Sequence, residues 1–373
     1  DLAAAIKTSK EYKGPVIIHV ISKKGKGYHP AEHDKTGVWH GLGPYKTETG
    51  EVLGQKSTES WSGFMSNTVL EHAHKDQSIV ALTPAMPVGS KLTKFQNELP
   101  ERFFDVGIAE QHAVTMSAGL AAAGMKPYLA IYSTFLQRGY DQLLHDVDRQ
   151  NLNVLVGIDR SGLVGADGET HQGVFDISFI SPLPNMTLMM PRDEKEAAMM
   201  IDLSFKTEGP MAIRYPRGNV LGVDMNEDRD SLKHGTWEVL KEGSDIVLIS
   251  YGPTLQTVLE AAHGLEEKGV SAKVINARFI KPMDYKMLDE IGNSKLPVFT
   301  VEEAMLIGGL GSMVSTYLND KQYSNLVQRL GIDNEYIEHG NVDRLLGDIG
   351  LTSSNIIDKS IQLLEVKNEK STY

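Results

Sequence analysis

The pattern of hydrophobic and polar positions changes near residue 58. Before that point, the first residues predict a helix, residues 16–21 predict a strand, and residues 23–28 form a turn-rich run. Residues 29–56 are polar and rich in glycine, and they show no hydrophobic period. Such a stretch is typical of a long linker or an extended arm.

Short apolar runs alternate with helical patterns from Glu59 onward. Continuous apolar strands separated by helices are typical of a parallel sheet that is covered on both faces. The predicted strands are 79–82, 128–132, 154–158 and 211–214, and the predicted helices between them include 109–123 and 194–205. This part of the chain therefore predicts one doubly wound domain.

A second α/β pattern follows an acidic surface linker at residues 224–230. Strands are predicted at 245–250, 272–277 and 297–301. The helix after the first of them has one apolar face, made of Leu255, Val258, Leu259, Ala262 and Leu265. The predicted fold class is α/β, with two doubly wound domains after an N-terminal extended linker. The predicted boundaries are 1–56 for the first segment, 57–222 for the first domain, 223–235 for a linker and 236–373 for the second domain.

Composition narrows the possible partners and the compartment. The 373 residues carry a formal net charge of −12, and this charge disfavours binding to nucleic acid or to an anionic membrane. The chain has no cysteine, which excludes disulfides and fits a reducing cytoplasm. No stretch approaches the roughly 20 apolar residues that a membrane-spanning helix needs. The chain starts at Asp1 as if inside a helix, so we expect it to be a fragment.

The start of the helix predicted at 109–123 is the first candidate site. Glu110 opens this helix, and a run of alanine and glycine follows. One interpretation is structural: Glu110 complements the positive end of the helix dipole. The small residues also suit a tightly packed helix, in which the carboxylate would be desolvated. The segment alone leaves both interpretations open.

Two further candidate segments follow predicted strands directly, where open α/β sheets bind their ligands. Residues 132–142 combine aromatic side chains with Arg138, which suits stacking on a flat heterocycle, although a helix start with core aromatics fits equally well. The polar, glycine-rich residues 159–173 have little value for a core.

The glycine-rich segment also carries three side chains that could bind a ligand or transfer protons. Arg160 offers forked donors to a phosphate, while Asp167 and His171 could bind hydroxyls or move protons. Arg214 and Arg217 lie at the end of the strand predicted at 211–214, near a Pro-Gly turn. Together with Arg160 they predict an anion site on an otherwise acidic protein.

We predict no metal site within this chain. His29 and His33 have i,i+4 spacing, but Pro30 lies between them and no third ligand is evident.

Taken together, these segments resemble the 1-deoxy-D-xylulose-5-phosphate synthase family, which is related to transketolase and to the pyruvate dehydrogenase E1 component. The similarity runs along the whole chain. It is carried by residues 23–28, 83–86, 108–112, 132–138, 165–172 and 276–282. The resemblance implies that pyruvate is decarboxylated and its two-carbon unit joined to D-glyceraldehyde 3-phosphate, with thiamine diphosphate and Mg²⁺ as cofactors.

The resemblance also implies roles for single residues at the cofactor. Glu110 would hydrogen-bond N1′ of the aminopyrimidine, a task for a carboxyl that can share a proton. Phe135 would stack on the aminopyrimidine, with Arg138 close by. The remaining residues implied around the cofactor are Lys24, Tyr28, His40 and Met86.

A second group of residues is implied at the aldehyde substrate. Tyr132, Arg160 and Arg217 would hold its phosphate. Asp167 and His171 would bind its hydroxyls and assist proton movement, so that the implied catalytic residues are Glu110, Asp167 and His171.

The diphosphate motif of the family, a Gly-Asp-Gly run with a downstream Asn, is not found in this sequence. The run Gly347-Asp348-Ile349-Gly350 comes too late and lacks that Asn. The resemblance therefore implies that the Mg²⁺ ligands lie on an N-terminal domain, of which residues 1–56 would be the end. That domain would be a partner of this chain, the chain would form homodimers, and alone it would be inactive.

Three other functions remain open. The chain could be the β-subunit of a 2-oxoacid dehydrogenase E1, or the C-terminal subunit of a split transketolase. It could also be a non-catalytic regulatory or assembly subunit. The acceptor separates the enzymes, because a dehydrogenase needs lipoyl transfer and transketolase uses a ketose donor.

Overall fold

The computed structural model describes residues 1–34, 39, 43–53, 59–225 and 232–370. The chain divides into two units, Asp1–Ser57 and Thr58–Tyr373.

The first unit contains little regular structure. Its helices are α1 (Leu2–Ser9) and α2 (His29–Glu32). The strand predicted at 16–21 is wrong, because this segment forms no strand and leaves Ile17 94% exposed. A strand requires a neighbour for its backbone N–H and C=O groups, and the described residues supply none here.

The second unit begins with a seven-stranded sheet in the order β10-β5-β6-β4-β3-β1-β2. Neighbours β5, β6, β4, β3, β1 and β2 are parallel, and β10 is antiparallel to β5. The strands are β1 (Ile79–Thr83), β2 (Phe103–Asp105), β3 (Lys126–Tyr132), β4 (Leu155–Asp159), β5 (Thr187–Met189), β6 (Met211–Arg214) and β10 (Phe279–Lys281). Every residue of β1 and β4 is buried, as continuous apolar runs predict for a sheet covered on both faces.

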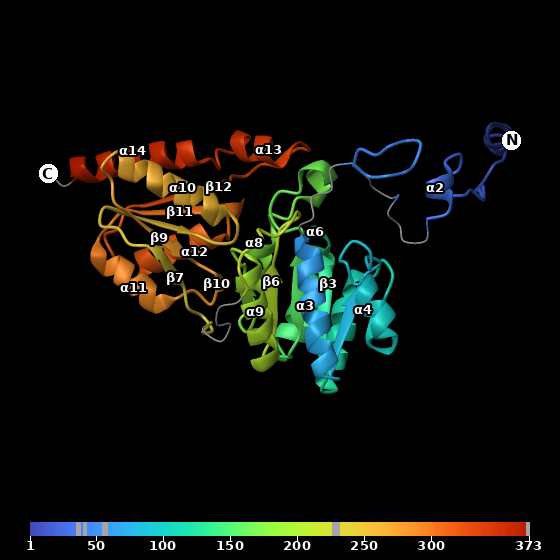
Figure 1. Ribbon diagram of the computed structural model, residues 1–373, viewed down its shortest axis with the longest axis horizontal. Coiled ribbons are helices and arrows are strands. Elements are labelled where there is room, and N and C mark those ends of the chain that lie inside the picture. Colours follow the sequence, from blue (N-terminus) through green and yellow to red (C-terminus); the bar gives the residue numbers. More distant parts are fainter. Residues whose placement is uncertain (35–38, 40–42, 54–58, 226–231, 371–373) are drawn as a thin grey trace. The chain divides into compact units, whose positions relative to one another are not determined.

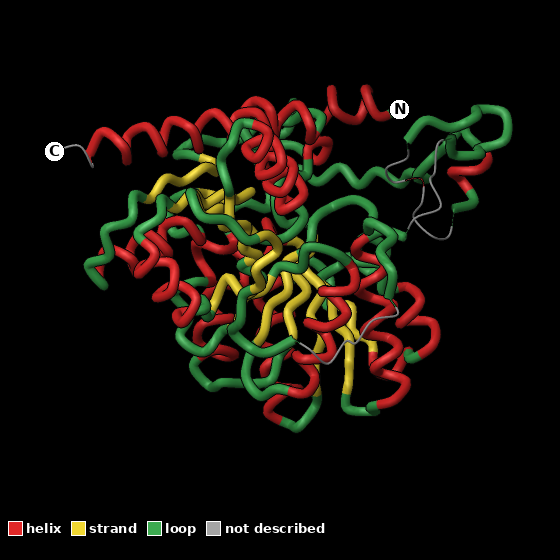
Figure 2. The backbone as a smooth tube through the Cα atoms, turned by 60° about the vertical axis from the view of Figure 1, so that its left-hand side comes forward, coloured by secondary structure: helices red, strands yellow, loops and turns green. Residues whose placement is uncertain are grey.

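Helices cover this sheet on both sides (Figure 2). Two of them, α3 and α9, lie side by side over one face (Figure 1), and α5 packs against β1 and β3. The helices of this part are α3 (Trp61–Lys75), α4 (Thr93–Glu98), α5 (Glu110–Ala122), α6 (Ser133–Leu136), α7 (Tyr140–Gln142), α8 (Asp176–Ile180) and α9 (Glu194–Lys206). The helices predicted at 109–123 and 194–205 are confirmed as α5 and α9.

A five-stranded sheet follows in the order β12-β11-β8-β9-β7. Figure 1 shows α10 and α14 over one face of it, with α11 and α12 over the other. The strands are β7 (Glu238–Lys241), β8 (Ile246–Ser250), β9 (Ala272–Asn276), β11 (Val298–Met305) and β12 (Val327–Ile332). The helices are α10 (Thr254–Glu267), α11 (Tyr285–Ser294), α12 (Leu310–Asp320), α13 (Val342–Asp348) and α14 (Ser353–Lys370). The predicted fold class, α/β with two doubly wound domains, is confirmed.

The hydrophobic pattern missed the strands that are short or lie at an edge. Strands β2, β5 and β10 have three residues each, too few to show a period, and the missed strands β7 and β12 are edge strands that are only partly buried. Strand β10 comes from the second half of the chain but pairs with β5 in the larger sheet. One hydrophobic core accordingly includes residues of both halves, among them Met190, Tyr251 and Phe279.

We predict that Gly157→Ala lowers stability. Gly157 lies on β4, and a Cβ there would overlap the ring of Tyr128, which is fully buried and donates or accepts a hydrogen bond at Tyr215 Oη (3.3 Å). Overpacking of this kind costs about 1–3 kcal/mol. Thermal unfolding of the two proteins measures the difference.

The matched control is Gly347→Ala in α13, where a Cβ meets no atom within 4 Å. Alanine favours helices over glycine by roughly 0.5–1 kcal/mol, so this variant should keep or raise the unfolding temperature. An equal loss in both variants would contradict the packing argument at Gly157.

Candidate active site

The candidate residues gather because four parallel strands end at one edge of the larger sheet. The chain reverses its strand order between β1 and β3, and ligands bind at such a reversal in open α/β sheets. Met86 follows β1, Tyr132 ends β3, Arg160 follows β4 and Arg217 follows β6. These residues are far apart in sequence, but their strands are neighbours.

Glu110 is the first residue of α5 and is only 4% exposed. Its Oε2 lies 2.8 Å from Nη1 of Arg138, whose side chain is 51% exposed. The contact lacks hydrogen-bond geometry, so Oε2 accepts no hydrogen bond within the described part of the chain. A Cβ at Gly139 would overlap Val114 of α5. The glycine therefore allows the turn that carries Arg138 to lie close to α5. The result is a buried carboxylate with a free acceptor position.

Three rings pack together where the segments after β3 and β4 meet. Tyr132 and Phe135 stack with centroids 5.5 Å apart, and Phe135 meets His171 edge to face at 5.4 Å. Thr134 Oγ1 donates to Thr170 O (2.8 Å), which joins the segment after β3 to the glycine-rich loop. Burial raises the pKa of Tyr132 to about 12, so its hydroxyl stays protonated at neutral pH.

Two guanidinium groups converge on Asp167. Arg160 Nε lies 3.4 Å from Asp167 Oδ2, and Arg217 Nη1 lies 3.1 Å from Asp167 Oδ1. The guanidinium of Arg160 lies 3.8 Å over the Tyr132 ring, an arrangement that fixes its plane. Arg217 also donates to Val164 O (3.1 Å). Two guanidinium groups thus meet at one carboxylate, and their remaining N–H donors suit an anion. Arg214, which was also predicted at this anion site, is instead fully buried against Asp176 (2.8 Å).

The structure thus brings the predicted residues into two groups near the carboxyl ends of the strands. Glu110 and Arg138 form a pair. A second group is joined by direct contacts and consists of Tyr132, Phe135, Arg160, Asp167, His171 and Arg217. Their roles stay predictions.

The other residues implied at the cofactor have different positions. Met86 lies in the turn after β1, where a Cβ at nearby Gly89 would overlap the Tyr132 hydroxyl. Lys24 and Tyr28 belong to the first unit, in which Tyr28 packs edge to face on Trp39 at 5.0 Å. His40 lies outside the described residues. The roles of Lys24, Tyr28 and His40 in cofactor binding remain predictions.

Sequence reasoning gave no role to Asp159, which the structure buries completely beside Arg160. Its Oδ1 lies 3.5 Å from Arg160 Nη1, and its carboxylate makes no hydrogen bond of good geometry. Burial raises the pKa of Asp159 to about 6, while Arg160 opposes the shift. The sequence feature that could have identified Asp159 is its position, because it is a carboxylate directly at the end of a fully apolar strand.

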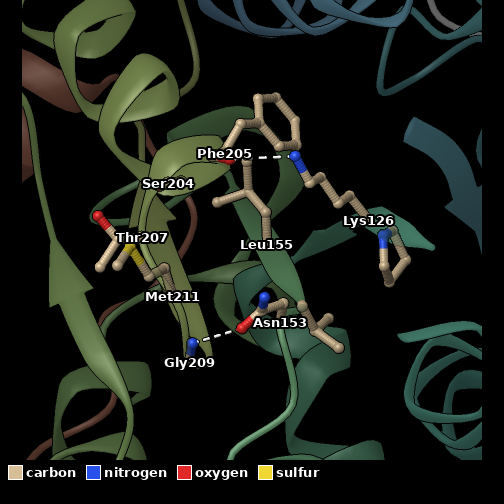
Figure 3. A pocket seen from close by; sticks show the side chains of 10 residues that line it. Lys126, Asn153, Leu155, Ser204, Phe205, Thr207, Gly209 and Met211 are labelled. Atoms are coloured by element: carbon tan, nitrogen blue, oxygen red, sulfur yellow. Dashed lines mark hydrogen bonds between the residues drawn. The ribbon is translucent and has the colours of Figure 1, made fainter. Parts of the chain in front are cut away.

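A small pocket lies at the opposite end of the sheet, among the amino-terminal ends of β3, β4 and β6 (Figure 3). Lys126 Nζ donates there to Phe205 O (3.3 Å), and Gly209 N–H donates to the Asn153 side chain. Its volume of about 20 Å³ holds little more than a water molecule. It offers no site for a substrate.

Neither a metal cluster nor a membrane-spanning helix is found in the part of the chain that the structure describes. No three side chains of His, Cys, Asp or Glu gather there to hold an ion. None of the described helices is long and apolar enough to cross a bilayer.

Comparison with known proteins identifies the domains. The family model for the transketolase pyrimidine-binding domain matches residues 58–221, and the model for the transketolase C-terminal domain matches residues 235–356. A split-gene transketolase solved as an inactive β4 tetramer superposes with a TM-score of 0.73 and 29% identity, covering 82% of this chain and 99% of that one. A Pichia stipitis transketolase, at 17% identity and a TM-score of 0.70, covers 84% of this chain and 47% of its own, and shares the fold. The fold and these matches define a transketolase-type protein.

Closer relatives narrow the class. The chain is 61% identical to the 1-deoxy-D-xylulose-5-phosphate synthase of Macrococcus caseolyticus and 55% identical to that of Geobacillus thermodenitrificans, over 100% of its own length in both cases. The chain spans 59% of the length of these relatives. It belongs to the 1-deoxy-D-xylulose-5-phosphate synthase family, a family of transketolase-type transferases.

We predict that Asp159→Asn reduces the pH dependence of stability. A folded-state pKa of about 6, above the usual 3.8, means that the folded protein holds this proton more tightly than the unfolded chain. The contribution of Asp159 is therefore fully present below pH 4 and is lost as the pH rises through 6. Between pH 5 and pH 8 the variant should gain about 1 kcal/mol relative to the parent. Urea unfolding at the two pH values measures this.

Asp146→Asn is the control, since Asp146 is partly exposed and its pKa is lowered by the hydroxyl of Thr115. That variant should show no gain between pH 5 and pH 8. An Asp159→Asn protein with the parent's pH profile would rule out a buried carboxyl that titrates near 6.

Proposed function

We propose that this chain is the part of a 1-deoxy-D-xylulose-5-phosphate synthase that binds the pyrimidine of thiamine diphosphate and the phosphate of the aldehyde. The proposed reaction decarboxylates pyruvate and joins its two-carbon unit to D-glyceraldehyde 3-phosphate, releasing CO₂. The product would serve isoprenoid, thiamine and pyridoxal synthesis. The observation that carries the proposal is the buried Glu110 carboxylate, which has a free acceptor position and lies 2.8 Å from Arg138.

The residues around Glu110 fit an aminopyrimidine. Bound thiamine diphosphate supplies the electron sink that decarboxylation of a 2-oxo acid requires. Glu110 would hold a proton between its carboxyl oxygen and the ring nitrogen N1′, and its burial excludes water that would compete for this bond. Phe135 is half-buried and would offer the open face of its ring, while Arg138 balances the charge of Glu110.

The two arginines would bind the phosphate of the aldehyde. Arg160 and Arg217 lie on either side of Asp167, so a phosphate that approaches them meets two guanidinium forks. The Tyr132 hydroxyl stays protonated and can donate a further hydrogen bond. Asp167 and His171 would orient the hydroxyl groups of the aldehyde and assist proton movement.

The diphosphate and Mg²⁺ would be held by residues outside this stretch. The sequence lacks the Gly-Asp-Gly motif, and the chain spans 59% of the length of its relatives. Ile17 and Ile21 are 94% and 87% exposed, as expected of a segment that packs against further residues. A similar split-gene transketolase chain forms an inactive tetramer on its own. We propose that the present chain alone is inactive too, and that Lys24, Tyr28 and His40 approach the cofactor only in the longer protein.

A homodimer in the cytoplasm is part of the proposal. Ile108, next to the start of α5, is 78% exposed, and Gly119 and Ala122 of α5 are exposed as well. An apolar surface beside the proposed site is typical of a face that a second copy covers.

The alternative is the C-terminal subunit of a split transketolase. The coverage of 99% of the split-gene transketolase chain favours it, but the identity to that chain is 29%, against 61% to the synthase of Macrococcus caseolyticus. The donor substrate separates the two functions, because the synthase consumes pyruvate and releases CO₂ whereas transketolase consumes a ketose.

We predict that Glu110→Gln abolishes CO₂ release. The assay uses the chain joined to its upstream coding sequence, with pyruvate, Mg²⁺ and thiamine diphosphate, and with or without D-glyceraldehyde 3-phosphate. The amide cannot share a proton in the same way, so the rate should fall by about 10²–10⁴-fold. The parent should release CO₂ faster when the aldehyde is present.

Two controls accompany this assay. The 373-residue chain alone should be inactive, and Glu98→Gln, at an exposed glutamate paired with His74, should leave the rate unchanged. Equal CO₂ release with and without the aldehyde would contradict the synthase and favour a dehydrogenase-type subunit.

We predict that Arg160→Ala weakens binding of the phosphorylated aldehyde specifically. Loss of a charge-assisted hydrogen bond costs about 1.5–3 kcal/mol, so KM for D-glyceraldehyde 3-phosphate should rise roughly tenfold to hundredfold. KM for unphosphorylated D-glyceraldehyde should change little, and Arg149→Ala, at an exposed arginine, should change neither. A parallel rise for both aldehydes would show that Arg160 does not bind the phosphate.

A further inference from the structure

The smaller sheet has its own strand-order reversal, between β8 and β11. In open α/β sheets the carboxyl ends of the strands at a reversal form a crevice that binds a ligand. In this chain side chains of the other domain lie there. The guanidinium of Arg214 lies 5.7 Å from the centroid of the Tyr251 ring, and a Cβ at Gly252 would overlap Met190. The position that holds a ligand in related architectures is therefore used to dock the first domain.

From this crevice, Glu303 of β11 reaches the glycine-rich loop of the candidate site. Its Oε1 accepts a hydrogen bond from Leu163 N–H at 2.6 Å. Gly162 lies against the same carboxylate, where any Cβ would overlap it. Gly162 in turn exchanges two backbone hydrogen bonds with Gly173 (2.7 and 2.8 Å), which closes the base of the loop that carries Asp167 and His171.

The loop has further attachments to the same domain. Gln172 is 3% exposed; its Nε2 donates to Glu338 O (3.1 Å) and its Oε1 accepts from Val164 N–H (2.8 Å). Met305 N–H donates to Val174 O (3.1 Å). An apolar cluster joins the two ends of the loop to the smaller sheet and to α13, and consists of Leu163, Val174, Met305, Ile332, Ile337 and Leu345.

The neighbouring residue Glu302 makes a useful contrast. It accepts hydrogen bonds from Leu310 N–H and Gly311 N–H (both 2.8 Å), at the start of α12 in its own domain. Burial raises the pKa of both Glu302 and Glu303 to about 7. Both carboxyl groups lie on β11, and both have a raised pKa. Only Glu303 accepts a hydrogen bond from the glycine-rich loop.

We propose that the C-terminal domain holds the glycine-rich loop in position for the substrate, and that Glu303 is the positioning residue that links the two. Glu303 fixes the base of the loop, and Asp167 sets the separation of Arg160 and Arg217 from the end of that loop. The inference rests on the proposed function only in naming the aldehyde phosphate as the ligand. The dependence of the loop on Glu303 stands without it.

Hydrogen exchange of backbone amides tests the positioning, in the full-length protein without cofactor or substrate. In Glu303→Ala the amide of Leu163 and those of residues 165–171 should exchange about tenfold faster, because an acceptor is lost. Glu303→Gln keeps a carbonyl acceptor and should restore most of the protection. The matched control Glu302→Ala should speed exchange at Leu310 and Gly311 and leave the loop unchanged.

If Glu303→Ala does not fold, Gln172→Leu removes an independent attachment and should loosen the same amides. Unchanged exchange of the loop in whichever of these variants folds would overturn the proposal.

Steady-state kinetics of the same proteins then separate the positioning from the proposed function. In Glu303→Ala, KM for D-glyceraldehyde 3-phosphate should rise about tenfold, while KM for pyruvate stays within about twofold. In Glu303→Gln, KM for the aldehyde should lie between the values of Glu303→Ala and the parent. A general structural defect would move both constants. Faster loop exchange without any change in KM for the aldehyde would support the positioning by Glu303 and contradict the assignment of the loop to that substrate.

Discussion

The parallel alignment of the strands in the larger sheet is the constraint on which the candidate site depends. Parallel strands end on one side, so the segments after β1, β3, β4 and β6 meet there although up to 130 residues separate them in sequence. The reversal of strand order opens the space between these segments. A sheet with alternating strand directions would have divided the same side chains between two edges.

Burial of charge is the second constraint, and it connects the site to the domain interface. Asp159 and Glu302 are fully buried and Glu303 is half-buried, and desolvation raises the pKa of each above its usual value. Arg214 is fully buried and pairs with Asp176 at 2.8 Å, in the same region. Removing one partner of such a group leaves an uncompensated charge. Two of these residues contact the other domain, Glu303 through Leu163 and Arg214 through Tyr251.

The position of the glycine-rich loop follows from both constraints. Its base is closed by backbone pairing of Gly162 and Gly173, and its sides contact the C-terminal domain through Glu303 and Gln172. Its far end presents Asp167 to Arg160 and Arg217. The C-terminal domain therefore contributes to the site through contacts with the loop, although no residue of that domain was predicted to have a role there.

The sequence by itself determined the fold class, the long strands and most of the cluster, because continuous apolar runs and helical periods are local patterns and Glu110, Arg160 and Asp167 lie beside them. Only the tertiary structure decided which strands are neighbours, that β10 crosses to the larger sheet, and that Glu303 contacts Leu163 over 140 residues. It also decided that residues 16–21 form no strand. The physical reason is the same in each case: pairing, desolvation and docking depend on groups distant in sequence, and no local pattern encodes which distant group will be the partner.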